Sequence, residues 1–516
     1  MGGKHTLLIL ALSCAAGVAF AAPLPVSRPH AAPASATTMD ISQRVDINEL
    51  SMSLTNFGAY AYDLSGLLGG LEFPRGSGKT GMFAGGLWLG AMVGGQPRVT
   101  VAEYDQEYRP GSARFGTPES PSLDANRVYR LNRVYGDPVG RDNALTEYEN
   151  GALSRGAPLV SVLPDGSLDI PGDVMFWSVC NDFLASAHVN EAGSTSPLGM
   201  EVKQTTWAYD RPGPFGRSLF MRFTIINRGT LTLADMHVGF WADPDLGDFV
   251  DDLVGCDSLR GLGYCYNGSP ADAIYGSAPP AVGMDLLQGP YRADLGARLG
   301  LTAFAAYKNG TDPLSASESF QSMHGRDLLG NPILDPNANP TRFKFAGDPV
   351  AGTGWIDTAP ADKRMLLSTG PITMAPGDIQ ELVVVLFVAQ GTDRLDSVSQ
   401  LEADDQLIQT AFDTNTLGRL EVPGSSGAQL ALQCTWPTPS RGGLSVAFSL
   451  PATGETSLDL LDVSGRRVAG RNLGRLAPGP HVESLARETD SLPAGMYFLR
   501  LTLAGASVVG RLVLTR

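Results

Sequence analysis

The alternation of apolar and polar residues along this chain predicts a protein built mainly from β-strands. Strand-like stretches lie at 50–56 and 85–93, and three more follow at 200–208, 218–227 and 236–241. The Asn227-Arg228-Gly229 turn leads out of the second of these three, so we expect them to form an antiparallel meander with one buried face. The stretch 381–389 is apolar throughout, which predicts a central strand buried on both faces.

A helix is predicted directly after that central strand, over about 393–413. Thr392 or Asp393 can cap its first turn. Its apolar residues fall on one stripe at helical spacing: Leu395, Val398, Leu401, Leu407, Ile408, Ala411 and Phe412. It is the only long helix that the pattern predicts. The turn-rich stretches 105–170 and 310–360 are expected to be long loops, the first with some short strands.

Beyond the linker-like Gly424-Ser-Ser-Gly427, the apolar residues again alternate with a period of two. Four strands are predicted there, at 444–450, 456–462, 495–501 and 508–514. The predicted fold class is therefore mainly β. It comprises a large multi-strand β-sandwich-type body with one notable helix, followed by a C-terminal Ig-like β-sandwich.

The first residues have the three parts of a secretory signal peptide: Lys4 and His5, an apolar run from Leu7 to Phe20, and small residues at the expected cleavage site. A lipid-attachment site at Cys14 is the alternative to ordinary cleavage. No later stretch is long and apolar enough for a membrane-spanning helix. The expected organisation is a signal peptide (1–22), a disordered Ala/Pro/Ser-rich leader (23–45), a β body of one or two subdomains (46–420), a linker (421–430) and the C-terminal domain (431–516). We therefore expect a secreted or cell-surface location.

The net charge bears on which partners the protein can bind, and the cysteines bear on whether it forms a disulfide. The net charge of −15 argues against nucleic acid as a partner, because binding a phosphate backbone requires clustered Lys and Arg. Export allows cysteines to oxidise, and Cys256 and Cys265 are candidates for a disulfide that closes a short loop. The two thiols could equally stay reduced, since connectivity does not follow from sequence.

Several C-terminal segments occur together in a recognisable order: Pro437-Thr-Pro-Ser-Arg-Gly, Asp462-Val-Ser-Gly-Arg-Arg-Val468 and Pro493-Ala-Gly-Met-Tyr-Phe-Leu-Arg500. They resemble the C-terminal sorting domains of proteins exported by the type IX secretion system, which are in turn similar to Ig-like domains of flagellar-hook-cap proteins. The resemblance covers about residues 430–516, and its motif residues here are Asp462, Gly465, Arg466, Gly495 and Tyr497. It implies an address read by the secretion machinery. The Trp-Asp-Gly segment of many members is replaced by Val482-Glu-Ser-Leu485, which puts the export route in doubt; the alternative is an Ig-like domain with no sorting role. The body resembles a group of uncharacterised bacterial surface proteins with such C-termini.

The clearest chemical feature of the body is an acidic loop after the strand 236–241. It holds six carboxylates within fifteen residues: Asp243, Asp245, Asp248, Asp251, Asp252 and Asp257. Crowded carboxylates repel one another, and a hard cation with six to eight oxygen ligands would organise them, so we expect a stabilising calcium site. The alternative is a solvated acidic loop that binds nothing.

Motifs for catalysis are not evident, and we predict no catalytic residue. The sequence has neither Gly-x-Ser-x-Gly nor His-Glu-x-x-His. The histidines beyond the signal peptide look too scattered for a metal site, and His188 is expected to be a buried structural residue. We therefore expect a non-catalytic surface or secreted protein that is structural, adhesive or ligand-binding, with glycans or other surface proteins as partners. The alternative is a secreted hydrolase acting on polysaccharide or protein.

Overall fold

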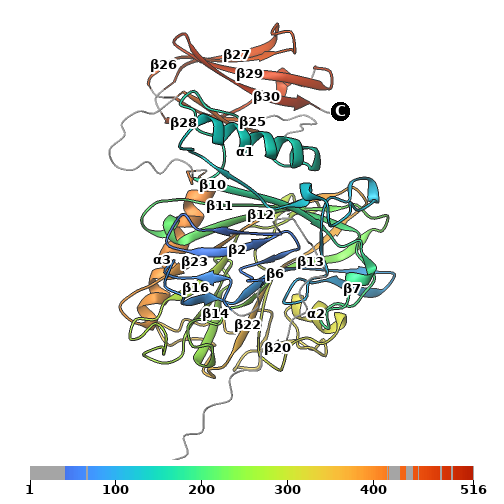
Figure 1. Ribbon diagram of the computed structural model, residues 1–516, viewed down its shortest axis with the longest axis vertical. Coiled ribbons are helices and arrows are strands. Elements are labelled where there is room, and N and C mark those ends of the chain that lie inside the picture. Colours follow the sequence, from blue (N-terminus) through green and yellow to red (C-terminus); the bar gives the residue numbers. More distant parts are fainter. Residues whose placement is uncertain are drawn as a thin grey trace, which may run out of the picture. The chain divides into compact units, whose positions relative to one another are not determined.

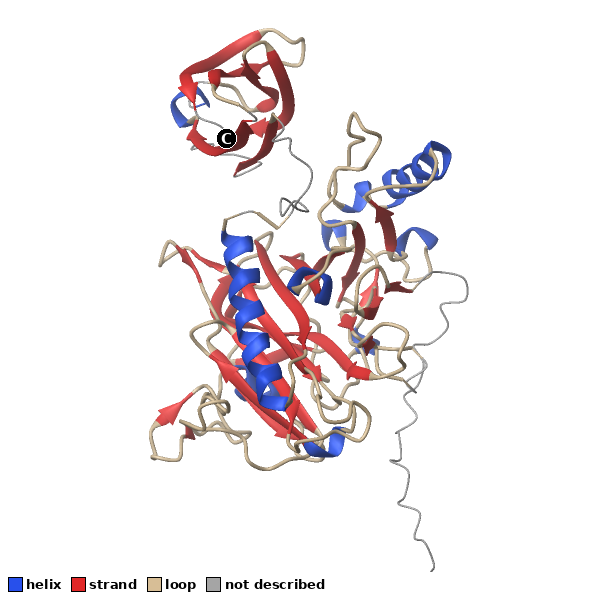
Figure 2. Cartoon of the chain, turned by 90° about the vertical axis from the view of Figure 1, so that its left-hand side faces the viewer, coloured by secondary structure: helices blue, strands red, loops and turns tan. Residues whose placement is uncertain are grey.

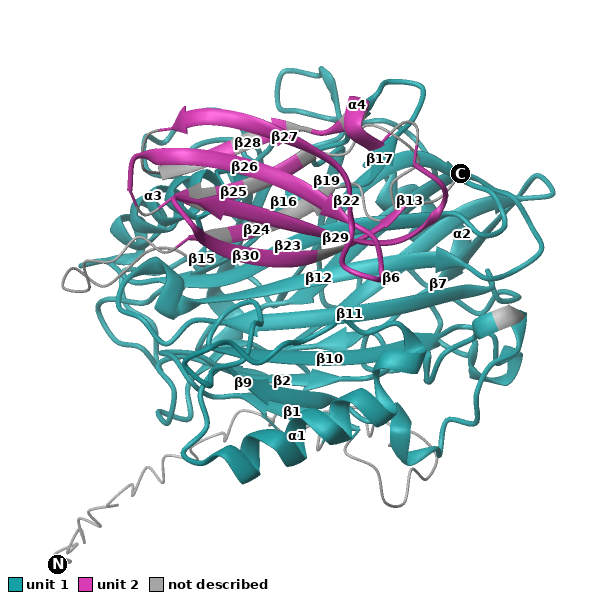
Figure 3. Ribbon diagram, turned by 90° about the horizontal axis from the view of Figure 1, so that it is seen from above, with its two compact units in different colours: residues 1–418 teal, residues 419–516 magenta. Residues whose placement is uncertain are grey.

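The computed structural model describes residues 41–64, 68–414, 416–417, 430–436, 445–450, 452–476, 479–489 and 492–514. The predicted signal peptide, most of the leader and nearly all of the linker lie outside these residues. Strand β1 (Ser42–Val45) lies inside the predicted leader, so the predicted end of the leader, at residue 45, is a few residues too late. The chain divides into two compact units, 1–418 and 419–516, which Figure 3 colours separately.

The first unit contains two large antiparallel sheets (Figure 1). The ten-stranded sheet consists of β1, β2 (Ser51–Thr55), β3 (Ala59–Tyr60), β4 (Leu71–Glu72), β5 (Thr80–Met82), β6 (Ala84–Val93), β7 (Gln96–Thr100), β13 (Leu233–Asp243), β19 (Ala303–Lys308) and β22 (Lys363–Met374). Its order is β19-β22-β13-β6-β3-β2-β4-β5, with β1 beside β2 and β7 beside β6.

The nine-stranded sheet consists of β8 (Arg109–Pro110), β9 (Tyr129–Asn132), β10 (Val174–Asn181), β11 (Met200–Ala208), β12 (Ser218–Asn227), β14 (Asp252–Asp257), β15 (Leu262–Asn267), β16 (Ala281–Gln288) and β23 (Ile379–Ala389). Its order is β14-β15-β16-β23-β12-β11-β10-β8, with β9 beside β10. Two small hairpins complete the strands of this unit: β17 (Tyr291–Arg292) with β18 (Ala297–Arg298), and β20 (Ile333–Leu334) with β21 (Pro340–Thr341).

The side chains of strand β23 alternate between two hydrophobic cores. Leu382, Val384, Leu386 and Val388 belong to the core between the two sheets. The alternate residues Val383, Val385, Phe387 and Ala389 belong to a second core on the outer face. Because successive strand residues point to opposite faces, a strand covered on both sides must be apolar throughout. The prediction of a central, doubly buried strand is confirmed.

Helix α3 (Arg394–Asp413) covers that outer face, as Figure 2 shows. Its N-cap is Asp393, whose side chain accepts hydrogen bonds from the backbone N–H groups of Leu395 and Asp396. Val398, Leu401 and Ile408 lie fully buried in the second core. The helix predicted over about 393–413 is confirmed, and so is the mainly β fold class.

Two shorter helices lie where loops were expected. Helix α1 (Pro138–Gly151) begins with an Asp137 N-cap and a proline at its first position, and it buries Tyr148 against β9 and β10. Helix α2 (Ala316–Met323) packs on the ten-stranded sheet through Phe320 and Met323.

The predicted meander is wrong in its third strand. Strands β11 and β12 pair in antiparallel fashion, but β12 then pairs with β23, whereas β13 lies in the other sheet between β6 and β22. The segment after the Asn227-Arg228-Gly229 turn therefore crosses from one layer of the sandwich to the other. Local turn chemistry does not specify which sheet receives the next strand.

The second unit is a small sandwich of seven strands. One sheet has the order β24 (Ala431–Trp436), β25 (Ser445–Leu450), β28 (Gly479–Ser484), and the other the order β27 (Arg467–Leu476), β26 (Gly454–Leu461), β29 (Gly495–Leu503), β30 (Ala506–Leu514). A short helix, α4 (Ala486–Thr489), follows β28. Residues from both sheets, among them Phe448, Leu460 and Leu499, share one core. This arrangement agrees with the predicted Ig-like sandwich.

Candidate functional site

Part of the predicted calcium loop forms a carboxylate cluster at the end of β13. Asp243 is the last residue of that strand, and Asp245 follows with a φ of +42°, in the left-handed region where aspartate is tolerated. Asp362 immediately precedes β22, the neighbouring strand. One carboxylate oxygen of each of these three aspartates lies within 4.8 Å of the others.

An arginine lies inside this cluster. The Arg364 guanidinium is 2.6 Å from Asp243 Oδ1 and 3.9 Å from Asp245 Oδ1, and it also pairs with Asp362. Tyr104 donates a hydrogen bond to Asp243 Oδ2. Asn309 Nδ2 donates to Asp362 Oδ2 over 2.8 Å. Three carboxylates and one guanidinium leave a formal charge of −2 when all are ionised.

This residual charge is held in a largely dry environment. Asp243 is only 1% exposed, and neither Asp243 Oδ1 nor Asp245 Oδ1 accepts a hydrogen bond from the described residues. Burial raises the pKa of both carboxyl groups, and the proximity of Asp243 raises that of Asp245 further, although Arg364 opposes both shifts. Protons or an additional cation would offset the remaining repulsion.

The other four predicted ligands do not join the cluster. Asp248 caps a short 3-10 helix, and Asp251 accepts a hydrogen bond from Asn267 Nδ2 over 3.1 Å. Asp252 is fully buried and accepts one from the Leu246 N–H over 3.0 Å. Asp257 pairs with Arg260 at the far end of β14, about 16 Å from Asp252 along the strand. One ion cannot span that distance.

The disulfide proposed between Cys256 and Cys265 is not formed, and both cysteines are buried free thiols. In the β14–β15 ladder Cys256 lies opposite Gly263, while Cys265 lies opposite Val254. The two cysteines are thus diagonal neighbours, whose Cα atoms are about 7–8 Å apart. A disulfide requires a closer approach than that.

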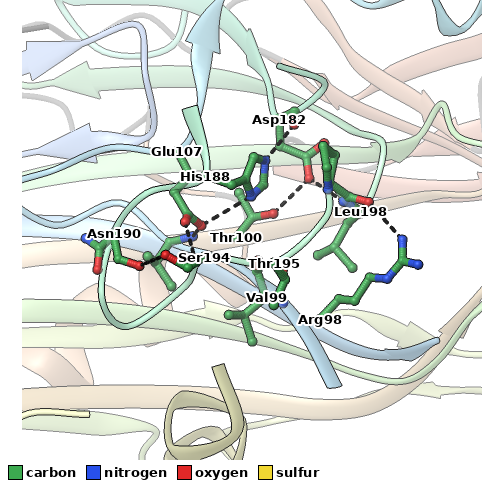
Figure 4. Close-up of polar contacts among 12 residues, drawn as sticks. Arg98, Val99, Thr100, Glu107, Asp182, His188, Asn190, Ser194, Thr195 and Leu198 are labelled. Atoms are coloured by element: carbon green, nitrogen blue, oxygen red, sulfur yellow. Dashed lines mark hydrogen bonds and ion pairs between the residues drawn. The ribbon is translucent and has the colours of Figure 1, made fainter. Parts of the chain in front are cut away.

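His188 belongs to a buried polar network, drawn in Figure 4. Its Nε2 lies 2.8 Å from the carbonyl oxygen of Asp182, and its Nδ1 lies 3.5 Å from Glu107 Oε2. Glu107 also accepts from the backbone N–H groups of Val101 and Ser194. Burial alone would lower the pKa of His188, but the hydrogen bonds and charges of Glu107 and Asp182 together outweigh it, and the net pKa is raised.

Asp182 completes this network. Its carboxylate accepts from the Thr100 hydroxyl over 2.8 Å and from the backbone N–H groups of Leu198 and Met200 over 2.7 and 2.6 Å. These bonds attach the loop after β10 to β7. His188 is therefore structural, as the sequence predicted.

The five motif residues of the C-terminal unit have definite places in its fold. Asp462 Oδ1 accepts from the N–H groups of Ser464 and Arg466, which closes the β26–β27 turn, and Gly465 within it has a φ of +81°. Gly495 is the first residue of β29, and the Tyr497 hydroxyl donates to the Pro493 carbonyl over 2.9 Å. The Arg466 side chain is 78% exposed.

A cavity of about 700 Å³ opens beside the β17–β18 hairpin. Its lining includes Tyr291, Arg292, Asp294, Thr373, Asp378 and Gln380. The Tyr291 residue is 47% exposed, so an aromatic ring stands beside several polar groups at this surface.

The histidines were expected to be too scattered for a metal site, and this expectation is wrong for one pair. His237 and His324 lie with their ring centroids 3.9 Å apart. They come from β13 and the end of α2, and no spacing in the sequence signals their contact.

Comparisons with known proteins give little further identification. No protein-family model matches the chain, and no curated protein matches it in sequence. Similar solved structures include a polysaccharide lyase, at 10% identity and a TM-score of 0.20, covering 61% of this chain and 34% of the lyase. They also include PorZ, described as an essential bacterial surface component of the type IX secretion system of Porphyromonas gingivalis, at 13% identity and a TM-score of 0.12, covering 70% of this chain and 45% of PorZ. This chain thus matches less than half the length of either protein, and superpositions this partial do not transfer an activity. Among the described residues, no helix combines the length and apolarity needed to cross a bilayer.

Proposed function

We propose that this chain is an exported, non-catalytic β protein of the bacterial cell surface, whose C-terminal unit is read by the secretion machinery. The observation that supports this most is the C-terminal sandwich, a compact unit of its own with an ordered Asp462-to-Arg466 turn. Asp462 and Gly465 shape the turn. The Arg466 side chain pairs with Asp462 Oδ2 at 3.1 Å but is mostly exposed, so a partner can still contact it.

Cell fractionation tests the proposal in a bacterium that has a type IX secretion system. The full-length chain should reach the surface, whereas a version ending at Gly424 should remain in the periplasm. Arg466→Ala should lower surface delivery without lowering the melting temperature, because its side chain is mostly exposed. Equal surface delivery of the full-length and shortened chains would exclude a sorting role.

Calcium is the stabilising ion that we propose for the body. Asp243, Asp245 and Asp362 can supply up to six oxygens, and calcium accepts six to eight in flexible geometry with water completing the shell. A divalent cation would balance the formal −2 charge of the cluster and give a second charged partner to the oxygens of Asp243 and Asp245 that face Arg364. Arg364 would then remain as the link between the two strands.

Thermal unfolding with and without calcium tests this site. If the Kd is about 0.1 mM, then 2 mM calcium stabilises the folded state by about 2 kcal/mol, which is a rise in melting temperature of about 2–5 °C. Asp245→Asn should abolish the rise, whereas Asp294→Asn, which changes an exposed aspartate, should leave it intact. A rise that persists in Asp245→Asn would place the calcium elsewhere.

The cavity beside the β17–β18 hairpin is where we propose that a glycan binds. An exposed tyrosine ring next to polar side chains suits a sugar, which has apolar faces and hydroxyl edges. A glycan array should show binding without turnover, and Tyr291→Ala should remove it. Release of sugar fragments from a bound polysaccharide would instead establish a hydrolase.

A further inference from the structure

A bulge in β13 turns two metal-ligating side chains toward helix α2. The register of β13 shifts between Met236 and Val238 against β22, and between Ala234 and His237 against β6. Within this irregular stretch Asp235 has a φ of +49°, in the left-handed region where aspartate is tolerated. Bulges commonly re-aim side chains at functional sites. Here the bulge places Asp235 and His237 beside His324, the C-cap of α2.

The three side chains converge on one point. His324 Nε2 lies 3.1 Å from Asp235 Oδ2. His237 Nδ1 lies 3.9 Å from Asp235 Oδ1 and 3.2 Å from the Asp235 carbonyl oxygen, which accepts its hydrogen. One ligand atom from each residue lies within 4.8 Å of the others. Two ligands of a tetrahedral zinc ion, at bond lengths of about 2.0–2.1 Å, are about 3.3 Å apart. The observed spacing therefore needs only small adjustments to admit an ion.

The hydrogen bond of His324 leaves a place for a cation. Its Nδ1 lies 2.7 Å from the Phe320 carbonyl oxygen, which can only accept, so Nδ1 carries the hydrogen. Nε2 of the neutral ring then presents a lone pair to Asp235 Oδ2, and two acceptors face each other. A proton on His324 would join them as a histidine–aspartate ion pair, whereas a metal ion would bind both groups and could engage the His237 ring as well. An Nδ1–H bound to a carbonyl is also the usual outer support of a metal-ligating histidine.

The His237 ring packs directly against Gly370, which has no side chain. A Cβ at Gly370 would lie 2.7 Å from the His237 ring, so a larger residue there would displace the imidazole.

We propose that Asp235, His237 and His324 bind a transition-metal ion of the zinc class. Two imidazoles and one carboxylate favour zinc or cobalt over calcium, which takes oxygen ligands. The Asp235 side chain is 44% exposed and the His324 side chain 19%, so the three ligands leave a coordination position open to water or another ligand. Asp235 also lines the cavity beside the β17–β18 hairpin, and a ligand in that cavity can approach the ion. This site is separate from the carboxylate cluster, which lies at the other end of β13.

Calorimetric titration of the metal-free mature protein with zinc tests the proposal. We expect one ion per chain with a Kd of about 10 μM or tighter, and a weakening of at least about tenfold in both His324→Gln and Asp235→Asn. Cobalt should give the intense visible absorption of a tetrahedral site, which these variants lose. Asp142→Asn, which changes an exposed aspartate of α1 outside these sites, should bind zinc as the unaltered protein does.

Melting temperatures of the variants show whether they fold. The proposal is overturned if the folded protein takes up no zinc at about 100 μM. It is equally overturned if folded His324→Gln and Asp235→Asn both bind zinc as tightly as the unaltered protein.

Discussion

A buried pair of carboxyl groups beneath helix α3 should make the stability of the body depend on pH. Asp285 on β16 is fully buried, and Asp405 on α3 is 1% exposed. Both carboxylate oxygens of Asp285 and Oδ1 of Asp405 are buried without a close hydrogen-bond partner among the described residues. Burial raises the pKa of Asp405 to about 7 even though Arg260 opposes the shift, and it raises that of Asp285 well above its usual range, with Asp405 adding to it. At neutral pH the folded pair therefore keeps a proton that the unfolded chain has released.

The sign of the effect follows from these shifts. Below about pH 4 both carboxyl groups are protonated in the folded and unfolded chain, and the pair costs nothing. As the pH rises from about 4 through 7, the unfolded chain binds fewer protons than the folded one, and stability is lost. A shift of about three pKa units at Asp405 corresponds to a ceiling of about 4 kcal/mol. Because buried charges relax and Arg260 is close, we expect about 2–3 kcal/mol.

The perturbation is Asp285→Asn, which replaces one acid by a neutral amide that can donate to Asp405. Urea unfolding at pH 5 and pH 8 should show the variant gaining about 2 kcal/mol relative to the unaltered protein on going to the higher pH. Asp396→Asn is the matched control on the same helix. Hydrogen bonds from Thr392 lower the pKa of Asp396, so it is ionised in the folded and the unfolded chain at both pH values, and its substitution should change stability equally at pH 5 and pH 8. If Asp285→Asn changes stability by the same amount at both pH values, the pair does not share a proton and the reasoning is wrong.

Five other substitutions test the packing and the turns of the two units. Gly193→Ala should destabilise the body by about 1–3 kcal/mol in urea unfolding, because its Cβ would lie 2.3 Å from the buried Glu107 carboxylate; a neutral result would contradict the packing around His188. Phe223→Ala in the core between the sheets should cost about 3–5 kcal/mol, whereas Leu407→Ala on the exposed side of α3 should cost under about 0.5 kcal/mol. Tyr497→Phe should destabilise the C-terminal unit by about 1 kcal/mol by removing the bond to Pro493, and calorimetry that finds no change would show that the bond is immaterial. Asp462→Ala should lower the melting temperature of that unit at pH 7. Its turn bonds hold the pKa of Asp462 down to about 2, so the stability they add is present above about pH 4 and lost as the pH falls through 2, and the variant should lack this acid transition.

The elements predicted correctly are those whose sequence pattern reflects tertiary burial. The apolar residues of strand β23 form one continuous run, and those of helix α3 recur at helical spacing. Both elements lie where they were expected. Helix α1 offers no such pattern, since Tyr148 and Gly151 are its buried residues and its start depends on the Asp137 cap. The partner sheet of β13 was not predictable from the turn before it.

The candidate sites, too, could be predicted from the sequence only where their residues are close together in the chain. Asp243 and Asp245 were found because they are close in sequence, but Asp362 and Arg364 join them from a strand more than a hundred residues later. Asp235 and His324 are 89 positions apart and meet only through a bulge and a helix end. Local spacing reveals a site only when one segment supplies most of its ligands.

Calcium binding to the carboxylate cluster is the most direct test of the account of the body. Isothermal calorimetry of the mature protein with calcium up to about 5 mM should show one ion bound per chain with a Kd of about 0.1–1 mM, and no heat in Asp245→Asn. The absence of heat in the unaltered protein would mean that Arg364 and bound protons alone balance the cluster, and would contradict the calcium site.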